Sequence, residues 1–367
     1  MATYNIMQVM PEFGLAGAET MCECLCNELI KKDNVKLTVV SLYDFHSPIT
    51  ERMEAQGIDV VYLGKKSGMD FSITKKLTKL MRERKINVVH THRYVMQYAI
   101  PAASRAKVPV RVHTVHSIAT EEVDKLRRKF AKFFYKHKAV KPVAISPIIK
   151  DTICEEYKIP ASKIHMVYNG SDLSKAKPKN DYSVNEKFTF THIGRLAPVK
   201  NQQLIIEAAE VLKNEGYDFR VNFIGGGSKE QEYKAEVEKR DLKDVVFFKG
   251  LQSNVHSFLT ESDCFLLPSL YEGMPVTLIE AMATALPVIA SRVGGIPDMI
   301  EDDKSGIIID PKLDELVEAM KRVMENSDLR ERLGKAAKEK SVEFSAENML
   351  NGYLAIYEEQ LNRKKDN

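Results

Sequence analysis

The sequence lacks several features that would narrow its function on their own. Its 367 residues include 54 basic and 51 acidic ones, so the net charge of +3 gives no reason to expect a nucleic-acid partner. No run approaches the roughly 18 apolar residues of a transmembrane helix. The chain also does not open with a cationic stretch followed by an apolar one, as a secretory signal would. We therefore expect a cytoplasmic protein.

Cysteine and glycine spacings argue against two further classes of protein. Three of the five cysteines, Cys22, Cys24 and Cys26, lie in one predicted helix, where their alternating spacing spreads the thiols over different faces. We expect reduced thiols and no zinc site. The glycines after the first predicted strand lack the G-x-G-x-x-G spacing, and no acidic residue ends the second strand, which argues against NAD binding.

Short β-branched runs alternate with helical stretches along most of the chain, which predicts parallel sheets in α/β layers. A chain this long usually forms two domains. The polar segment 174–187, which contains Pro178, breaks the rhythm and is the predicted linker. We therefore predict two doubly wound, Rossmann-like domains, over residues 1–173 and 188–345, followed by a final helix over 346–362.

The individual elements follow from the same alternation. In the first domain, strands are predicted at 5–10, 37–42, 60–63, 87–91, 110–115, 143–146 and 163–167, and helices at 18–31, 72–84 and 95–107. In the second domain, strands are predicted at 188–193, 219–224, 245–249, 263–267, 288–290 and 306–309. Open α/β sheets bind ligands beyond the carboxyl ends of their strands, so we expect a site in a cleft between the domains.

Residues 272–280 read Glu-Gly-Met-Pro-Val-Thr-Leu-Ile-Glu, with two carboxylates separated by seven residues. Pro275 suits the first turn of a helix, and Gly273 lets a ligand approach the backbone closely. The loop amides can bind an anion or a hydroxyl, while Glu280, one to two turns into the helix, can accept hydrogen bonds from a sugar. The alternative is a surface helix with two solvated glutamates.

Two glycine-containing segments follow strands of the second domain. In His-Ile-Gly-Arg-Leu-Ala-Pro-Val-Lys-Asn (192–201), Gly194, Arg195 and Lys200 lie at the carboxyl end of a strand. An arginine fork and a lysine point charge there can neutralise a departing diphosphate. Gly225 and Gly226 follow the next strand and can pass close to a base or phosphate, although plain turn geometry also explains them.

These segments together resemble glycosyltransferase family 4, whose members are retaining enzymes of the GT-B fold with an E-x7-E signature. The likeness extends over 263–275, 281–283 and 287–298. It implies transfer of a hexose-type sugar from a nucleoside diphosphate sugar to a hydroxyl of a glycan or lipid-linked acceptor, with UDP-sugar as the first expectation and GDP-sugar as the second. It also implies that the last helix, about 346–367, packs back on the first domain.

The resemblance implies roles for particular residues. Glu272 is expected to contact the donor sugar and Glu280 its ribose, while Arg195 and Lys200 stabilise the leaving diphosphate. Leu251 is expected beside the base. The other donor-lining positions that the resemblance implies are Gly273, Met274, Pro275 and Val276.

The loop after the first strand contributes to the same expectation. Gly14 and Gly17 follow that strand and precede a helix, so they are expected to shape a loop above the bound sugar and phosphates. Members of the family commonly carry G-G-A-E here. This chain keeps Gly17, Ala18 and Glu19, but Ala16 replaces the first glycine.

Histidines gather at two strand ends of the first domain, in Val88-Val-His-Thr-His and Arg111-Val-His-Thr-Val-His-Ser. A histidine there can donate to a sugar hydroxyl or to a backbone carbonyl. The resemblance points to His116 beside the transferred sugar and to His92 on the acceptor side. His113 is the rival candidate, and packing alone is the alternative for each.

Residues 125–141 are heavily basic, carry no acidic residue and interleave aromatic side chains. On a helix this makes a cationic surface beside an apolar stripe, which can rest on anionic lipid at the inner face of the cell membrane. Such contact suits a polyprenyl-linked acceptor and cell-surface polysaccharide synthesis. An ordinary helix with its aromatics in the core is the alternative, and soluble acceptors remain open.

No convincing Asp-x-Asp site occurs, so we expect neither a metal nor another cofactor; cationic side chains and helix N-termini can stabilise the diphosphate instead. The sequence supports no assignment of a nucleophile, because no second carboxylate has a defensible geometry. The alternatives to a glycosyltransferase are a GT-B relative such as a nucleotide-sugar epimerase or a glycan phosphorylase, and a non-catalytic nucleotide-sugar-binding protein.

Overall fold

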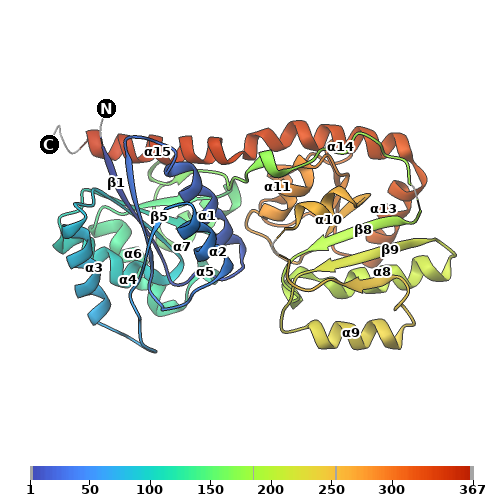
Figure 1. The fold of residues 1–367 in the computed structure, drawn as a ribbon, viewed down its shortest axis with the longest axis horizontal. Helices are drawn as coiled ribbons and strands as arrows, with labels where there is room; N and C mark the ends of the chain where they lie inside the picture. The colour runs from blue at the N-terminus through green and yellow to red at the C-terminus, as the bar shows by residue number, and fades with distance from the viewer. Residues whose placement is uncertain (1–2, 185, 253, 364–367) are drawn as a thin grey trace. The chain divides into compact units, whose positions relative to one another are not determined.

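A computed structural model describes residues 3–184, 186–252 and 254–363. The chain divides into two compact units (Figure 1). Unit 1 combines the chain up to Gly170 with the segment from Ala346 onward, and unit 2 runs from Ser171 to Ser345. Each unit contains one parallel sheet with helices on it, so the predicted fold class of two doubly wound α/β domains is confirmed.

Unit 1 is built on a seven-stranded sheet in the order β3-β2-β1-β4-β5-β6-β7, with every pair of neighbours parallel. This is the strand order of a Rossmann-type sheet, in which the order reverses between β1 and β4. The strands are β1 Tyr4–Met10, β2 Val35–Ser41, β3 Asp59–Tyr62, β4 Val88–His92, β5 Val110–Val115, β6 Lys141–Ala144 and β7 His165–Met166.

The helices of unit 1 carry the apolar spacing that buries one face. In α3, Ile73, Leu77 and Met81 recur every four residues and are buried, which contributes about 1.5–3 kcal/mol for each side chain. The helical elements are α1 Gly17–Leu29, α2 Pro48–Ala55, α3 Ser72–Glu83, η1 Arg93–Val95, α4 Met96–Arg105, α5 Ala119–Glu122, α6 Lys125–His137, α7 Pro147–Tyr157, η2 Ala161–Lys163 and α15 Ala346–Asn362.

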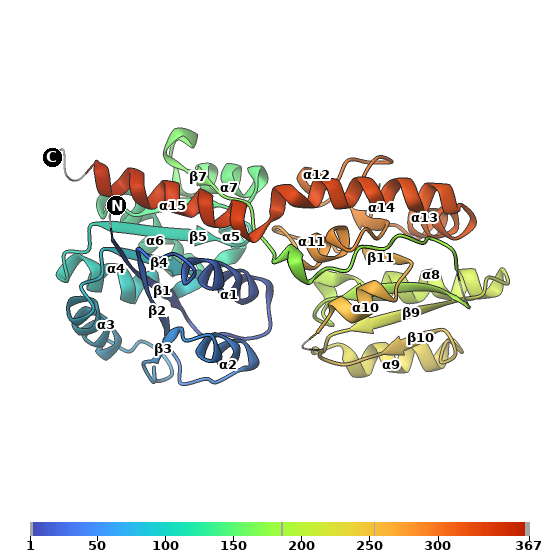
Figure 2. The same ribbon diagram turned by 45° about the horizontal axis from the view of Figure 1, so that its top comes forward.

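The C-terminal helix α15 belongs to unit 1, where it lies beside α1 (Figure 2). Two of its tyrosines reach the buried centre of the sheet. The Tyr357 hydroxyl lies 2.7 Å from His90 Nδ1, His90 Nε2 lies 2.8 Å from Thr114 Oγ1, and the Tyr353 hydroxyl lies 2.8 Å from the same threonine oxygen. This continuous network satisfies polar groups on β4 and β5 and fixes the helix on the sheet.

Unit 2 is built on a six-stranded parallel sheet in the order β10-β9-β8-β11-β12-β13. Its strands are β8 Phe188–Ile193, β9 Phe219–Ile224, β10 Val246–Phe248, β11 Cys264–Leu267, β12 Val288–Ser291 and β13 Ile307–Ile309. Its helical elements are η3 Leu173–Lys175, η4 Pro198–Lys200, α8 Gln202–Asn214, α9 Glu230–Lys239, α10 His256–Thr260, α11 Val276–Ala283, α12 Ile296–Met299, α13 Leu313–Glu325, α14 Ser327–Ser341 and η5 Val342–Phe344.

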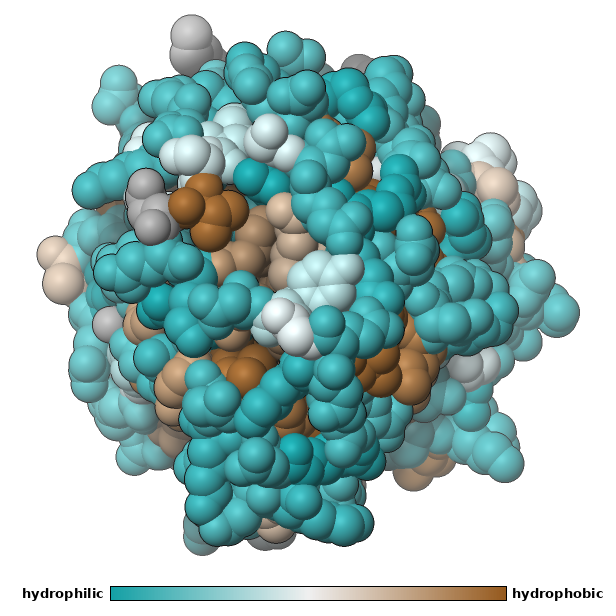
Figure 3. Space-filling view, turned by 90° about the vertical axis from the view of Figure 1, so that its right-hand side faces the viewer, coloured by the Kyte–Doolittle hydropathy of each residue, from teal (hydrophilic) through white to brown (hydrophobic). Residues whose placement is uncertain are grey.

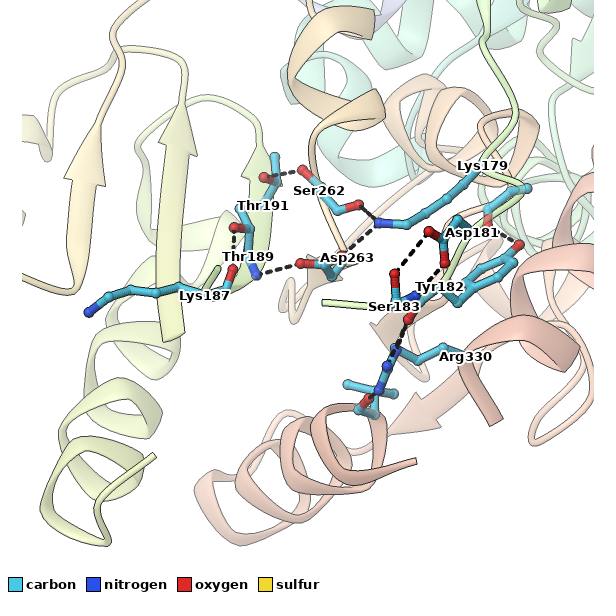
Figure 4. Close-up of polar contacts among 12 residues, drawn as sticks. Lys179, Asp181, Tyr182, Ser183, Lys187, Thr189, Thr191, Ser262, Asp263 and Arg330 are labelled. Carbon is cyan, nitrogen blue, oxygen red and sulfur yellow. Dashed lines mark hydrogen bonds and ion pairs between the residues drawn. The ribbon is translucent and has the colours of Figure 1, made fainter. Parts of the chain in front are cut away.

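The described part of the segment 174–187, predicted as a linker, is packed on unit 2 (Figure 4). The Lys179 ammonium pairs with Asp263 at 2.6 Å, and both side chains are largely buried. The Tyr182 hydroxyl donates to the Ala285 carbonyl oxygen at 2.9 Å, and Arg330 donates to the Tyr182 carbonyl oxygen at 2.7 Å. A buried charge is costly unless it is paired, so these contacts hold the segment on the domain. The structure therefore places it inside unit 2.

The amino ends of β8 and β9 border a depression on unit 2. Apolar side chains line it together with the carboxylates of Glu186, Asp218 and Glu325. Figure 3 shows this end of the molecule as mostly hydrophilic, with hydrophobic side chains in its recesses. Among the described residues, no helix is both long enough and apolar enough to cross a membrane.

Candidate active site

The candidate donor site in unit 2 begins with two glycine loops that pack against each other. Gly194 follows β8 and donates to the Ile224 carbonyl oxygen at 3.0 Å. Gly225 follows β9 with φ +134°, and a β-carbon there would lie 2.1 Å from the Gly194 carbonyl oxygen. A β-carbon on Gly226 would meet Leu251 Cγ at 3.4 Å, so this glycine and Leu251 are neighbours. Gly225 is thus required by the close approach of the two loops.

A buried histidine supports the first of these loops. His192 Nδ1 lies 2.9 Å from the Leu266 carbonyl oxygen, and its Nε2 lies 3.0 Å from Gln202 Nε2. Because an amide nitrogen can only donate, His192 Nε2 accepts and Nδ1 carries the proton. Burial lowers the pKa of His192 to about 4, so the ring is neutral. Gln202 also donates to the Arg195 carbonyl oxygen at 2.9 Å and so holds the loop that carries Arg195.

The two cationic residues predicted to bind diphosphate differ in their surroundings. Lys200, in η4, pairs with Glu272 at 2.6 Å, and the two side chains are 20% and 8% exposed. Ser269 donates to the same Glu272 oxygen at 2.7 Å. Arg195 is exposed, and its guanidinium forms no ion pair with the described residues. Lys200 and Glu272 are therefore brought together by the fold, while Arg195 is open to an anion.

The loop of Glu272 is fixed by a glycine that the sequence did not single out. Gly294 has φ +55°, and a β-carbon there would lie 1.6 Å from the Glu272 carbonyl oxygen. The next residue, Gly295, donates to the Gly273 carbonyl oxygen at 3.0 Å. No residue but glycine fits at position 294 without displacing the Glu272 backbone.

Helix α11 carries the second carboxylate of the pair. Pro275 is its N-cap, with φ −74° and ψ 116°, and the helix begins one residue later than predicted, at Val276. Met274 is buried just before it. Desolvation raises the pKa of Glu280 to about 7, and the positive charge of Lys175 opposes that shift. The Glu280 carboxyl accepts no hydrogen bond from a described residue, so it can take one from a ligand hydroxyl.

In unit 1, the loop between β1 and α1 is open. Beta-carbons on Gly14 and Gly17 would meet nothing within 4 Å. The N-cap of α1, Ala16, has no side chain that could accept a hydrogen bond from the first-turn amides. These amides are suited to an anion or a hydroxyl, and the role of the loop above the donor sugar stays a prediction.

Two of the three candidate histidines are brought together at the carboxyl ends of β4 and β5. His92 Nδ1 lies 3.0 Å from His116 Nε2, and His92 Nε2 lies 2.9 Å from Gln8 Oε1. The Gln8 amide oxygen can only accept, so the proton of a neutral His92 is on Nε2. His92 Nδ1 then accepts a hydrogen bond from His116 Nε2. His116 Nδ1 is then a buried acceptor without a partner among the described residues. Burial lowers the pKa of His116 well below its ordinary value, so the ring is neutral.

His113 lies apart from that hydrogen-bonded pair. It is buried on β5, with Nδ1 2.9 Å from Thr91 Oγ1 and its ring next to Tyr135. Burial lowers its pKa to about 3. These contacts explain the residue as part of the core.

No three His, Cys, Asp or Glu side chains within the described ranges are grouped so that they could hold a metal ion. The expectation of metal-independent chemistry stays a prediction. Four residues that matter for the site were missed from the sequence: His192, Gln202, Ser269 and Gly294. Their roles depend on contacts that appear only in the folded chain, although Gly294 falls within the segment 287–298 that carries the family resemblance.

Comparisons with known proteins agree with this geometry. The family described as Glycosyl transferases group 1 matches residues 174–340, and Glycosyltransferase Family 4 matches residues 15–175. The UDP-Gal:alpha-D-GlcNAc-diphosphoundecaprenol alpha-1,3-galactosyltransferase of Escherichia coli is 31% identical over 274 residues, which is 69% of this chain and 70% of that protein. The N-acetyl-alpha-D-glucosaminyl L-malate synthase of Bacillus anthracis is 26% identical over 81% of each chain.

Solved structures share the fold. A glycosyltransferase from Rickettsia africae superposes with a TM-score of 0.84 over 98% of this chain and 99% of that one, at 20% identity. Anabaena Alr3699/HepE in complex with UDP and glucose also gives 0.84, over 96% and 98% of the two chains, at 19% identity. The sequence relatives, the two family matches and the GT-B architecture together show that this chain belongs to glycosyltransferase family 4.

Proposed function

We propose that the protein is a retaining glycosyltransferase that moves a hexose-type sugar from a nucleoside diphosphate sugar, with UDP-sugar as the first candidate, to a hydroxyl of a lipid-linked acceptor. The observation that carries this proposal is the Lys200–Glu272 pair beside the glycine loops of unit 2, with Arg195 exposed on the same loop as Lys200. These cations supply the charge that a departing diphosphate requires.

Donor binding rearranges the Lys200–Glu272 pair in this proposal. The Lys200 ammonium donates one or more of its hydrogen bonds to the diphosphate in place of Glu272. The planar guanidinium of the exposed Arg195 donates two more hydrogen bonds to the diphosphate. Glu272, held by Ser269, then accepts from hydroxyls of the donor sugar. The Glu280 carboxylate, which accepts no hydrogen bond from a described residue, accepts hydrogen bonds from the ribose hydroxyls. Two cations replace the metal that other transferases use on diphosphate.

Retention is proposed on chemical grounds. The leaving diphosphate, stabilised by Arg195 and Lys200, lies on the face from which the acceptor hydroxyl attacks and accepts its proton. The names of two relatives specify alpha-linked sugars, which is the configuration that retention gives from an alpha-linked nucleotide sugar. UDP is favoured because a relative uses UDP-Gal and a solved structure of this fold holds UDP and glucose.

The acceptor side rests on helix α6 and on the relatives. Three apolar side chains of α6 are exposed: Leu126 by 63%, Phe130 by 38% and Phe133 by 48%. Lys129 and Lys136 are exposed on the same helix. Apolar groups next to lysines favour the surface of an anionic membrane, where each basic residue contributes about 1 kcal/mol. A relative acts on a diphosphoundecaprenol-linked sugar, and we propose a polyprenyl-linked acceptor at the inner face of the cell membrane.

The test is release of nucleoside diphosphate from UDP-, GDP- and ADP-sugars, with and without membrane lipid extract. The wild type is compared with Lys200→Ala, Glu280→Ala and the control Lys239→Ala, an exposed lysine of α9. We expect release from one donor, stimulation by lipid, and loss in the first two variants only. Turnover that needs inorganic phosphate, or that ignores the lipid extract, points to a phosphorylase or an epimerase, and binding without turnover contradicts an enzyme.

A further inference from the structure

Asn201 and Gln202 follow Lys200 directly, and the side chain of each forms a hydrogen bond to a different loop of unit 2. The Asn201 amide donates to the Pro268 carbonyl oxygen at 3.1 Å, in the loop after β11. The Gln202 amide donates to the Arg195 carbonyl oxygen at 2.9 Å, in the loop after β8. Lys200 therefore lies beside two residues that connect the ends of two strands.

The chain around Lys200 is connected to the loop after β11 by backbone contacts as well as by side chains. The Leu270 amide donates to the Val199 carbonyl oxygen at 2.8 Å, one residue before the lysine. The Lys200 ammonium pairs with Glu272 at 2.6 Å. With the bond from Asn201, three successive residues thus contact the same loop. These contacts fix the backbone of the lysine and thereby the position from which its ammonium reaches Glu272.

Asn201 suits its position through its backbone and its side chain. It has φ +56° and ψ 39°, the left-handed region, at the point where η4 ends and α8 begins. Asparagine adopts this conformation more readily than most residues. In an ordinary turn its side chain bonds the backbone nearby. Here the acceptor lies 67 residues further along the chain, so the Asn201 amide connects two loops instead of closing one.

Gln202 is fully buried at the start of α8. Both protons of its amide are used, because Nε2 lies 3.0 Å from His192 Nε2 as well as 2.9 Å from the Arg195 carbonyl oxygen. That carbonyl oxygen can only accept, which fixes the orientation of the amide. Burial leaves Gln202 Oε1 without a partner among the described residues, and this is costly. The two donated bonds, and not apolar packing, therefore explain a glutamine at this position.

We propose that Asn201 and Gln202 are positioning residues of the donor site. They keep the two cations of the preceding loop, Arg195 and Lys200, where the diphosphate binds, and they act on the donor through these cations. The inference rests on the proposed function, in which the two cations meet the diphosphate. The stem of Lys200 lies next to Gly194, where a β-carbon would be 3.6 Å from Lys200 Cδ and Cε. The lysine has little room on that side, so a displaced backbone moves its ammonium away from the diphosphate.

The test is isothermal titration calorimetry with UDP, GDP and ADP and with the corresponding monophosphates. The variants are Asn201→Gly, which keeps the left-handed backbone and removes the amide, and Gln202→Leu, which keeps most of the volume and removes both donors. The matched control is Gln203→Leu, which replaces a half-buried glutamine whose amide donates to Glu207 within α8. The three variants thus separate the two proposed positioning bonds from an ordinary bond on the same helix.

The expected effect is confined to the diphosphate. For the diphosphate that binds the wild type most tightly, we expect its Kd to rise about threefold to tenfold in Asn201→Gly and about tenfold or more in Gln202→Leu, as the loss of one or two hydrogen bonds implies. The Kd of the control, and the Kd of the monophosphate in every variant, should change by less than about twofold. In a Lys200→Met background the ammonium is gone, so Asn201→Gly should then change the diphosphate Kd by less than about twofold.

Three results would overturn the inference. They are that both variants bind the diphosphate as tightly as the wild type, that the control weakens binding as much as Gln202→Leu, or that Asn201→Gly has the same effect with and without Lys200. The last result would assign Asn201 a general structural role. A failure of the proposed function looks different, because the variants then lose diphosphate affinity as expected while the wild type turns over no nucleotide sugar. A wild type that binds none of the three diphosphates would overturn both.

Discussion

Removal of Lys200 should lower both the stability and the activity of the protein, and a second substitution at Glu272 separates the two effects. Two unit charges 2.6 Å apart attract by about 6 kcal/mol at an effective dielectric constant of 20. Desolvation offsets most of this, and Lys200 keeps 20% of its surface in water while Glu272 keeps 8%. We therefore expect Lys200→Met to lower the free energy of unfolding by about 1–3 kcal/mol, because it leaves a mostly buried carboxylate whose remaining side-chain partner among the described residues is the Ser269 hydroxyl.

Replacing Glu272 as well should restore much of that stability. In Lys200→Met/Glu272→Gln neither charge remains buried, so we expect a free energy of unfolding within about 1 kcal/mol of the wild type. Catalysis should not recover, because the diphosphate has lost its lysine; removal of one electrostatic donor typically lowers kcat by about 10²–10³. Urea unfolding and nucleoside diphosphate release measure the two quantities on the same samples.

Two outcomes would refute this reasoning. One is a Lys200→Met protein that keeps kcat within about threefold of the wild type, which would mean that Lys200 does not act on the leaving group. The other is a double variant less stable than Lys200→Met, which would mean that the pair is not the dominant interaction of Glu272. A Lys213→Met variant, which removes a half-buried lysine paired with Asp241 and Asp244 far from Glu272 in the chain, serves as the control.

Three further predictions follow from the site and from α6. Since the folded-state pKa of Glu280 is raised to about 7, the wild type should lose stability as the pH rises from about 4.5 to 7. In urea titrations, Glu280→Gln should remove this pH dependence and be about 1–2 kcal/mol more stable than the wild type at pH 8. Equal pH profiles of the two proteins would contradict this prediction. Gly294→Ala should destabilise by about 2 kcal/mol or more and abolish donor turnover, because its β-carbon collides with the Glu272 loop; a stable, active variant would contradict the geometry. Replacing three lysines of α6 by Gln should weaken binding to anionic vesicles about 100-fold, because each lysine contributes about 1 kcal/mol. Co-sedimentation measures this binding, with neutral vesicles as the control. Unchanged binding would exclude α6 as the membrane contact. The three lysines are Lys129, Lys132 and Lys136.

The strands were the most predictable part of the fold. Runs such as 110–115 and 219–224 are rich in β-branched or aromatic residues that alternate with polar ones, and the structure reproduces both ranges without change. Other strands begin or end elsewhere than predicted. β2, for example, begins at Val35 and ends at Ser41, because its pairing with β1 continues over those residues. Pairing with a neighbour is a tertiary property that periodicity does not contain.

The site was predictable where its chemistry lies in one short segment. Glu272, Gly273 and Glu280 could be singled out because a turn, a helix start and two carboxylates occur within nine residues. Ser269 could not be singled out, since a serine before a loop has many ordinary explanations. Its hydrogen bond to Glu272 is visible only in the folded chain. Gly294 became visible only when its backbone was seen against the Glu272 carbonyl group.

Composition did not reveal how the segment 174–187 packs. Its polar residues and Pro178 predicted an interdomain linker, and the structure shows in addition that Lys179 is 14% exposed and paired with Asp263. Tyr182 is buried as well and receives two hydrogen bonds from Arg330 on its carbonyl oxygen. All these partners lie more than 80 residues away, so no local pattern reveals them.

The central claim is that the protein moves a sugar from a nucleoside diphosphate donor with retention of configuration. The most direct measurement follows the reaction by ¹H NMR with UDP-glucose, UDP-galactose and UDP-N-acetylglucosamine and membrane lipid extract, recording UDP release and the anomeric coupling of the new linkage together. The account predicts stoichiometric UDP release with one donor and an alpha-linked product, both lost in Lys200→Met. A beta-linked product would contradict retention, and a folded protein that releases UDP from none of the three would contradict the proposed UDP-sugar specificity.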